Sequence, residues 1–242
     1  MKIFFSYLLF FLFPFTHYAQ IVNIESLRNE NNKQFNGYIK IAYDFKKVNE
    51  IDWEMENEIF LNWNYKSWTI YLINEINLDR GAGIDFSNDG FQHLRINNKI
   101  NSKITIESFF QNQYDPIRKI DNRILFGGGL RRNIFNHYFG ISSFFEQEKL
   151  NYSTRENNLR LSSYLNLNYN LNKLMIIYST LYFQPKINSF NDYRFSNETE
   201  ITFKISKKFF FSNKIEISYD SFPAIGIPNT LINYKNGFSY KF

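Results

Sequence analysis

The chain contains 242 residues with 28 Lys and Arg, 23 Asp and Glu and no Cys, and its 28 Phe, 17 Tyr and 3 Trp make up a fifth of the sequence. An apolar share of 44% with only five Pro excludes a disordered or collagen-like chain. The absence of Cys excludes disulfides and thiolate metal sites. The mean hydropathy of -0.40 excludes a bundle of transmembrane helices, so any membrane role requires another architecture.

The first 19 residues have the pattern of a secretory signal peptide. Lys2 precedes an apolar run over 3–15, and a polar stretch leads to Ala19 before Gln20. The alternative is a single anchoring helix, but this run is shorter than the ~20 apolar residues that span a bilayer, and Pro14 interrupts it. We therefore expect the protein to be exported and cleaved after Ala19.

Beyond residue 35 apolar and polar residues alternate with period 2, which is typical of β-strands. In 159–169, for example, Leu159, Leu165 and Tyr169 share one face, while Arg160 and Asn166 lie on the other. The pattern predicts an all-β chain with twelve strands, at 36–47, 54–65, 67–78, 91–101, 103–114, 122–134, 138–150, 158–171, 174–184, 192–205, 209–220 and 231–242.

The connections between these strands alternate in length. Short links at 66, 102, 135–137, 172–173 and 206–208 separate longer ones at 48–53, 79–90, 115–121, 151–157, 185–191 and 221–230. Long strands, an even strand number and this asymmetry predict an antiparallel transmembrane β-barrel. A sheet crosses hydrocarbon only when it closes on itself, because lipid offers no partner to an unpaired strand edge.

Aromatic residues near strand ends fit the interfacial girdles of a membrane barrel; they are Trp63, Tyr65, Trp68, Tyr138 and Tyr169. The alternative, a soluble β-sandwich or lipocalin-like barrel, also alternates but commonly has shorter strands. We expect a signal peptide over 1–19, a periplasmic segment over 20–35 and an outer-membrane β-barrel over 36–242.

Six motifs occur in order along the chain: NDGFQHLR at 88–95, ESFFQNQY at 107–114, RILFGGGLR at 123–131, YFQP at 182–185, DYR at 192–194 and YDSFP at 219–223. With the terminal Phe242 they make the chain resemble the domain of unknown function 481 family in its Bacteroidetes form, described as putative salt-induced outer-membrane proteins. A related barrel family, domain of unknown function 2490, is the next most similar. The resemblance covers nearly all residues from Gln20 onward and implies an outer-membrane β-barrel, with no established reaction or ligand.

The final strand ends on an aromatic residue after alternating aromatics, with Phe238, Tyr240 and Phe242 on one face. Outer-membrane barrels resemble one another in this ending, which the barrel-assembly machinery reads as an insertion signal. The alternative is that any last strand can end in Phe. We expect that machinery and outer-membrane lipid to be the partners. Heavy use of Asn, Lys, Ile, Phe and Tyr can reflect genome bias, so the alkaline pI does not indicate nucleic acid.

In the predicted barrel the face opposite the apolar residues lines the interior, and it carries charges of both signs. In a narrow interior these side chains either pair with one another structurally or border an aqueous path as a selectivity element. The candidates are Arg123, Arg131, Arg160, Arg194, Glu107, Glu146, Glu148, Glu198, Glu200 and Glu216, with Gln111, Lys204 and Asp220 on the same face.

Three other features predict no catalysis and no cofactor. The Gly run at 127–129 lacks the Lys-Ser/Thr of a phosphate loop, and within a strand Gly permits a bend or makes room for bulky neighbours. The Asp-containing link at 79–90 lacks EF-hand spacing, so a solvated loop is expected and no metal. His93, expected to face the interior, and His137, in a short turn, have no motif-level Ser partner.

These observations favour a non-enzymatic outer-membrane barrel that passes small polar solutes or has a structural, envelope-stress role. Two alternatives stay open. One is an outer-membrane hydrolase acting on lipid, for which His93 is the best candidate base. The other is a barrel whose long loops bind a partner at the cell surface.

Overall fold

The computed structural model describes residues 34–47, 51–81, 84–116, 118–151 and 155–240, and its regular structure consists of twelve β-strands. The strands are β1 (Phe35–Lys47), β2 (Ile51–Tyr65), β3 (Trp68–Gly81), β4 (Ile84–Lys99), β5 (Ile104–Asp115), β6 (Ile120–Ile134), β7 (His137–Leu150), β8 (Arg155–Asn170), β9 (Met175–Lys186), β10 (Ser189–Lys204), β11 (Phe209–Asp220) and β12 (Thr230–Tyr240). No helix in these ranges is long and apolar enough to cross a membrane.

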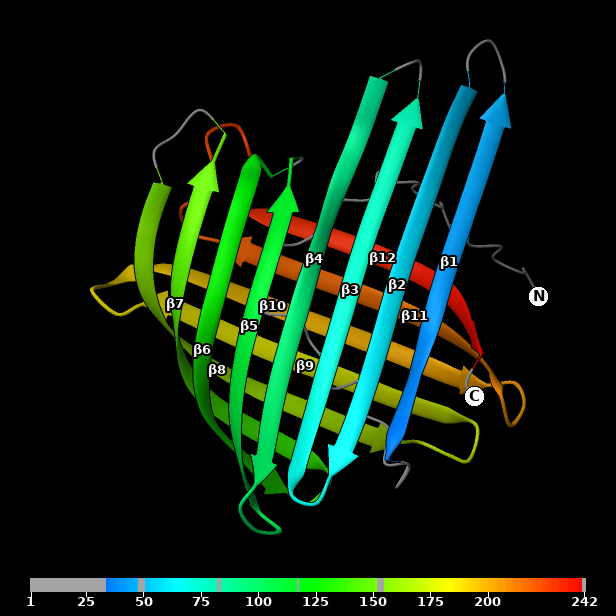
Figure 1. Ribbon diagram of the computed structural model, residues 1–242, viewed down its shortest axis with the longest axis vertical. Helices are drawn as coiled ribbons and strands as arrows, with labels where there is room; N and C mark the ends of the chain where they lie inside the picture. The colour runs from blue at the N-terminus through cyan, green and yellow to red at the C-terminus, as the bar shows by residue number, and fades with distance from the viewer. Residues whose placement is uncertain (1–33, 48–50, 82–83, 117, 152–154, 241–242) are drawn as a thin grey trace, which may run out of the picture.

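The strands form one antiparallel meander in which each strand pairs with the next, from β1 to β12. The sheet curls so that β8 to β12 lie behind β1 to β5 (Figure 1). Among the described residues the recorded pairings end at β1 and at β12, without a β1–β12 ladder that would join the two edges. The predicted all-β antiparallel architecture with twelve strands is confirmed.

The curled sheet has an apolar exterior and a polar interior. On β6, Phe126 and Leu130 are 55% and 54% exposed, whereas the side chain of Arg123 is fully buried. The same alternation holds on β8, where Leu159 is exposed and Arg160 is buried. This is the reverse of a water-soluble domain, in which large exposed apolar surfaces are rare. The exterior therefore suits contact with lipid.

Five of the six predicted long loops are shorter than predicted, and two of them are largely strand. Most of 79–90 is strand, because β3 continues to Gly81 and β4 begins at Ile84, with a register shift between Asp79 and Arg80. Likewise β9 runs to Lys186 and β10 begins at Ser189, which leaves 187–188 as the connection. Polar residues at these strand ends resembled a loop in the sequence, yet their backbone continues the ladder. Only 221–229 is a long connection among those at this end.

The eleven connections between the twelve strands lie at two rims. The turns 66–67, 100–103, 135–136, 171–174 and 205–208 form the turn rim, and the other six connections form the loop rim. The expected signal peptide and nearly all of the expected periplasmic segment over 20–35 lie outside the described residues, so both stay predictions.

Candidate functional site

The carboxylate of Glu146 on β7 is the centre of a buried charge cluster in the barrel interior, near the loop rim. It accepts hydrogen bonds from Nε of Arg123 at 2.6 Å, Nε of Arg160 at 2.7 Å and Nη1 of Arg194 at 2.5 Å. Arg194 belongs to β10, three strands from β7, so this contact crosses the interior. We call these residues and the partners described next the Glu146 cluster.

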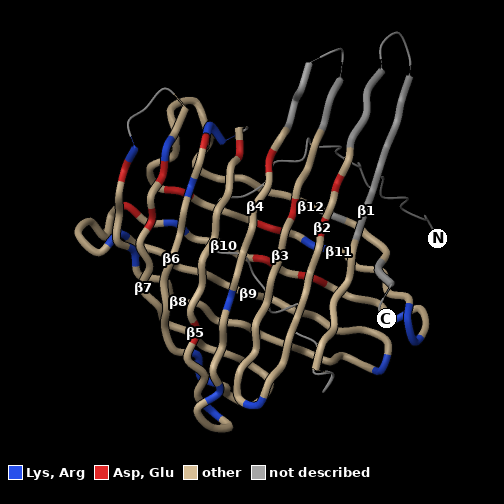
Figure 2. The backbone as a smooth tube through the Cα atoms, viewed as in Figure 1, with Lys and Arg blue, Asp and Glu red and all other residues tan. Residues whose placement is uncertain are grey.

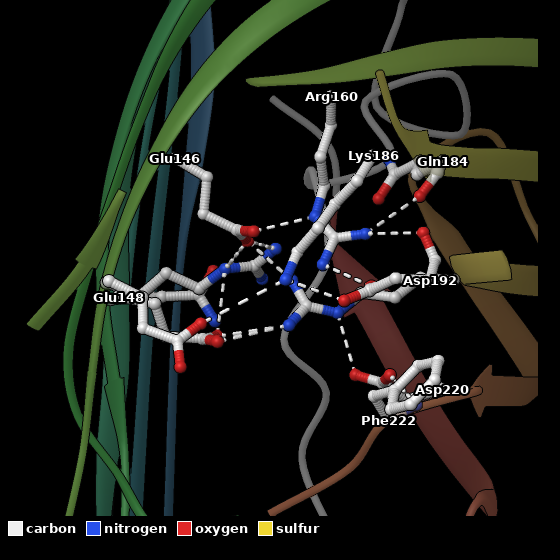
Figure 3. A network of polar contacts seen from close by, with 12 residues as sticks. Glu146, Glu148, Arg160, Gln184, Lys186, Asp192, Asp220 and Phe222 are labelled. Carbon is white, nitrogen blue, oxygen red and sulfur yellow. Dashed lines mark hydrogen bonds and ion pairs between the residues drawn. The ribbon is translucent and has the colours of Figure 1, made fainter. Parts of the chain in front are cut away.

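Three further carboxylates neutralise the cluster's arginines. Nη2 of Arg194 lies 3.2 Å from Glu148, and its Nε donates to Asp220 at 2.7 Å. Nη2 of Arg160 donates to Asp192 at 2.9 Å. On the other side of Asp192, Nζ of Lys186 lies 2.6 Å from its second oxygen (Figure 3). The cluster thus joins strands from β6 to β11 through paired charges, as buried charges require.

The last connection, 221–229, folds over the cluster at the loop rim. The backbone N–H of Phe222 donates to Asp220 at 2.9 Å, and Ser221 exchanges hydrogen bonds with the backbone of Tyr193. Its tip reaches the opposite wall, where Nζ of Lys119, in the β5–β6 connection, donates to the carbonyl of Ile225 at 2.6 Å. This segment lies at the mouth of the barrel beside the upper ends of β6 and β7 (Figure 1).

A small cavity of about 30 Å³ lies beneath this connection, lined by Arg118, Glu148, Arg194, Asp220 and apolar residues of 221–229. Its size suits a water molecule and excludes a larger solute. Burial lowers the pKa of Arg118 to about 10, so its guanidinium still carries a charge at neutral pH. The side chains of the Glu146 cluster and the connection above them therefore narrow the barrel at the loop rim.

A second group of interior charges lies toward the turn rim. Glu107 on β5 accepts a hydrogen bond from the hydroxyl of Tyr164 at 2.7 Å and lies 3.5 Å from Nε of Arg131. Arg95 on β4 lies 3.9 Å from the same carboxylate. Arg131 also stacks on the ring of Tyr138, 4.6 Å from its centroid.

A third group lies on β10 and β11 and is more open to water. Nζ of Lys214 lies 2.6 Å from Glu216 and 3.5 Å from Glu198, and all three side chains are 16–29% exposed. Glu200 pairs with Lys214 in the β10–β11 register and accepts a hydrogen bond from Thr202. Three glutamates around one lysine give this wall of the interior an acidic character.

The opposite wall is apolar between the charged groups. Phe109, Leu125 and Phe144 form a buried cluster on β5, β6 and β7. Gly127 stands opposite Phe144 in the β6–β7 register, and a Cβ there would overlap Phe144. The Gly run therefore makes room for a bulky interior neighbour, one of the two expectations from the sequence.

The ten predicted interior charges thus divide among three groups. Arg123, Arg160, Arg194, Glu146 and Glu148 belong to the Glu146 cluster, Glu107 and Arg131 contact each other, and Glu198, Glu200 and Glu216 surround Lys214. Sequence reasoning missed Lys186, Asp192 and Lys214 as members. Asp192 and Lys214 alternate in phase with the predicted interior residues Arg194 and Glu216, so strand alternation was a sufficient signal for both. Lys186 lies in 185–191, which the sequence predicted as a loop, so no alternation was available for it.

The remaining predicted sites behave as follows. His93 is fully buried; its Nδ1 lies 2.9 Å from Gln111 and its Nε2 accepts from Arg95. Across the described part of the chain, no group of His, Asp or Glu is placed to hold a metal ion. Phe238 points outward and is 71% exposed, while the side chain of Tyr240 and all of Phe242 lie outside the described structure, so the insertion signal stays a prediction.

Comparison with known proteins agrees with this geometry. The sequence model of one family, described as "Protein of unknown function, DUF481", matches residues 29–242. A NanC porin has a similar structure, with a TM-score of 0.54 at 14% identity over 86% of this chain and 98% of the porin. The predicted β-barrel fold is therefore confirmed.

Two other solved structures match with lower scores. A porin refined at 1.8 Å resolution has a TM-score of 0.41 at 6% identity, over 77% of this chain and 62% of that one. The β-domain of the Bordetella autotransporter Brka has a TM-score of 0.38 at 10% identity, over 86% and 96%. No curated protein matches the sequence.

Proposed function

Because this chain belongs to the DUF481 family, whose function is unknown, and has a porin-like barrel fold, we propose that it is an outer-membrane pore for small polar solutes. The observation that carries the proposal is the reversed burial pattern. Interior positions on the described strands are mostly polar or charged, while the exterior is apolar. Such a barrel is compatible with lipid outside and water inside.

In this proposal the solutes pass along the part of the interior formed by β10 and β11, where the charged side chains are more exposed. The side chains of Lys214, Glu198 and Glu216 are 29%, 16% and 18% exposed, whereas those of Arg123 and Glu146 are fully buried. We place the narrowest part at the Glu146 cluster and 221–229, and we expect passage there to be limited to ions and small solutes. The excess of glutamate around Lys214 favours cations.

Conductance across a planar bilayer tests this function. We expect the refolded protein to give small, discrete channels, and Glu198→Gln with Glu216→Gln to shift the reversal potential in a salt gradient toward anions. Glu156→Gln is the control, because this carboxylate is 61% exposed at the loop rim, outside the path. A bilayer that stays sealed at high protein load would remove the pore and leave a structural role for the paired interior charges.

We also propose that the barrel has no enzymatic activity and that its partners are outer-membrane lipid and the barrel-assembly machinery. Both ring nitrogens of His93 have polar neighbours within the interior, and its side chain is shielded from lipid by the β4 backbone. A base in that position has no route to a lipid ester. The alternating aromatics Phe238, Tyr240 and Phe242 supply the proposed assembly signal.

A further inference from the structure

Charges are unevenly divided between the two rims of the barrel. The five turns of the turn rim, with three residues on each side, contain eight Lys or Arg and no Asp or Glu. The six connections of the loop rim, counted in the same way, contain eight Lys or Arg and nine Asp or Glu. The formal charge is therefore +8 at one rim and 8 − 9 = −1 at the other, and most of the acidic positions in Figure 2 lie away from the turns.

The cations of the turn rim are exposed to the surroundings of the barrel. All eight side chains are exposed: Lys66, Lys99, Lys103, Arg132, Lys173, Lys204, Lys207 and Lys208. Six of them belong to the turns themselves or to the outer face. Lys99 and Lys204 instead lie on the same strand face as the interior residues of β4 and β10. A solvated basic surface of this density repels itself unless anions neutralise it.

Aromatic side chains fix the depth of this rim in a membrane. Trp63, Tyr65 and Trp68 are 45–50% exposed beside the β2–β3 turn, and Tyr169 is 47% exposed beside the β8–β9 turn. Such amphipathic rings settle at the headgroup level of a bilayer. Lys66 lies just beyond them, with Nζ 5.3 Å from the ring centroid of Tyr65. The turn cations therefore lie at the depth of the lipid phosphates.

The turns also indicate which leaflet this rim meets. The connections of the turn rim, where β1 begins and β12 ends, have at most four residues, whereas the one long connection, 221–229, lies at the other rim. Outer-membrane barrels place their short turns on the periplasmic side and their longer loops outside. We propose that the turn rim binds the headgroups of anionic phospholipids in the periplasmic leaflet and so holds a ring of them around the barrel. This inference depends on the membrane location in the proposed function, but not on the pore.

Two tryptophans of the rim can report the bound lipid directly. In a Trp53→Phe background the remaining reporters are Trp63 and Trp68, both beside Lys66. Vesicles of phosphatidylcholine with about a quarter phosphatidylglycerol carry bromine on the acyl chains of one lipid or the other, and quenching then measures which lipid touches the rim. We expect phosphatidylglycerol to quench several times more than its share of the bilayer, since one cation near a surface changes lipid partition about fivefold at low salt.

Charge variants separate a specific rim from a general membrane attraction. Lys66→Gln with Lys103→Gln should lower the preference severalfold, as should high salt. The matched control is Lys149→Gln with Arg155→Gln, two exposed cations of the loop rim, which should leave it unchanged. Quenching by each lipid in proportion to its share of the bilayer would overturn the proposal. Displacement of phosphatidylglycerol by lipid A would overturn the assignment to the periplasmic leaflet, and no quenching by either lipid would instead contradict membrane insertion.

Discussion

Glu146→Gln should destabilise the barrel more than any other conservative change in its interior. The carboxylate accepts three charge-assisted hydrogen bonds of 2.5–2.7 Å from Arg123, Arg160 and Arg194. Such bonds contribute about 1.5–3 kcal/mol each, but the amide keeps one acceptor oxygen and the contributions are not additive. Removing one partner from a buried ion pair costs about 3–5 kcal/mol, because unpaired charge stays buried. We expect a loss of this size.

Urea unfolding of the refolded barrel in lipid vesicles measures this loss, with tryptophan fluorescence and gel mobility as two probes of the same transition. Glu156→Gln is the matched control, since its carboxylate is exposed and 4.0 Å from Lys186. An exposed pair contributes about 0–1 kcal/mol, so this variant should unfold like the parent. If Glu146→Gln changed the free energy of unfolding by less than about 1 kcal/mol, the Glu146 cluster would not hold the interior together.

Three further outcomes are expected. Gly140→Ala should cost about 1–3 kcal/mol in urea unfolding, because its Cβ would overlap the ring of Tyr164, whereas Gly237→Ala, with open space around it, should cost little; equal effects would contradict the packing. Replacing 222–228 with a short Gly-Ser turn should raise single-channel conductance, because that segment lies at the mouth, and an unchanged conductance would show that it does not obstruct the path. The parent and His93→Ala should release fatty acid from phospholipid vesicles at the same rate. A measurable activity of the parent that the variant loses would instead favour the hydrolase.

Strand positions could be predicted from the sequence because alternation has a direct physical cause. Leu159 and Arg160 are neighbours in the chain, but successive side chains in a strand point to opposite faces. Lipid outside and polar groups inside then select apolar and charged residues in turn, and both faces of β8 follow the prediction. The same reasoning placed Glu146 and Arg194 in the interior.

Connection lengths were less predictable because polar composition does not distinguish a loop from a strand outside the membrane. The link at 79–90 has three aspartates and two glycines before Gly90, yet β3 and β4 continue through most of it. Water is available to those backbones, so composition there is not constrained by hydrocarbon. This correction shortens the surface available to a partner, which weakens the alternative of a barrel that binds through long loops.

The partners within the interior could not be predicted from the sequence either, because they depend on how the sheet curls. Parity places Glu146 and Arg194 inside, but their contact requires β7 and β10 to face each other at the same height along the barrel. Height depends on the cumulative register of three intervening ladders, and a slip of two residues in one of them moves a side chain by about 7 Å. No local sequence pattern therefore predicts the cumulative register that brings Glu146 and Arg194 together.

The contrast between the two walls of the interior follows from the same curl. Where β6, β7, β8 and β10 approach, arginine and glutamate pair so closely that Arg123 and Glu146 have no exposed surface. Where β10 meets β11, the carboxylates of Glu198 and Glu216 share one lysine and keep contact with water. Paired charges at full burial hold strands together, whereas carboxylates in contact with water attract mobile cations. One interior can therefore serve both roles that the sequence left open, stability on one wall and ion selection on the other.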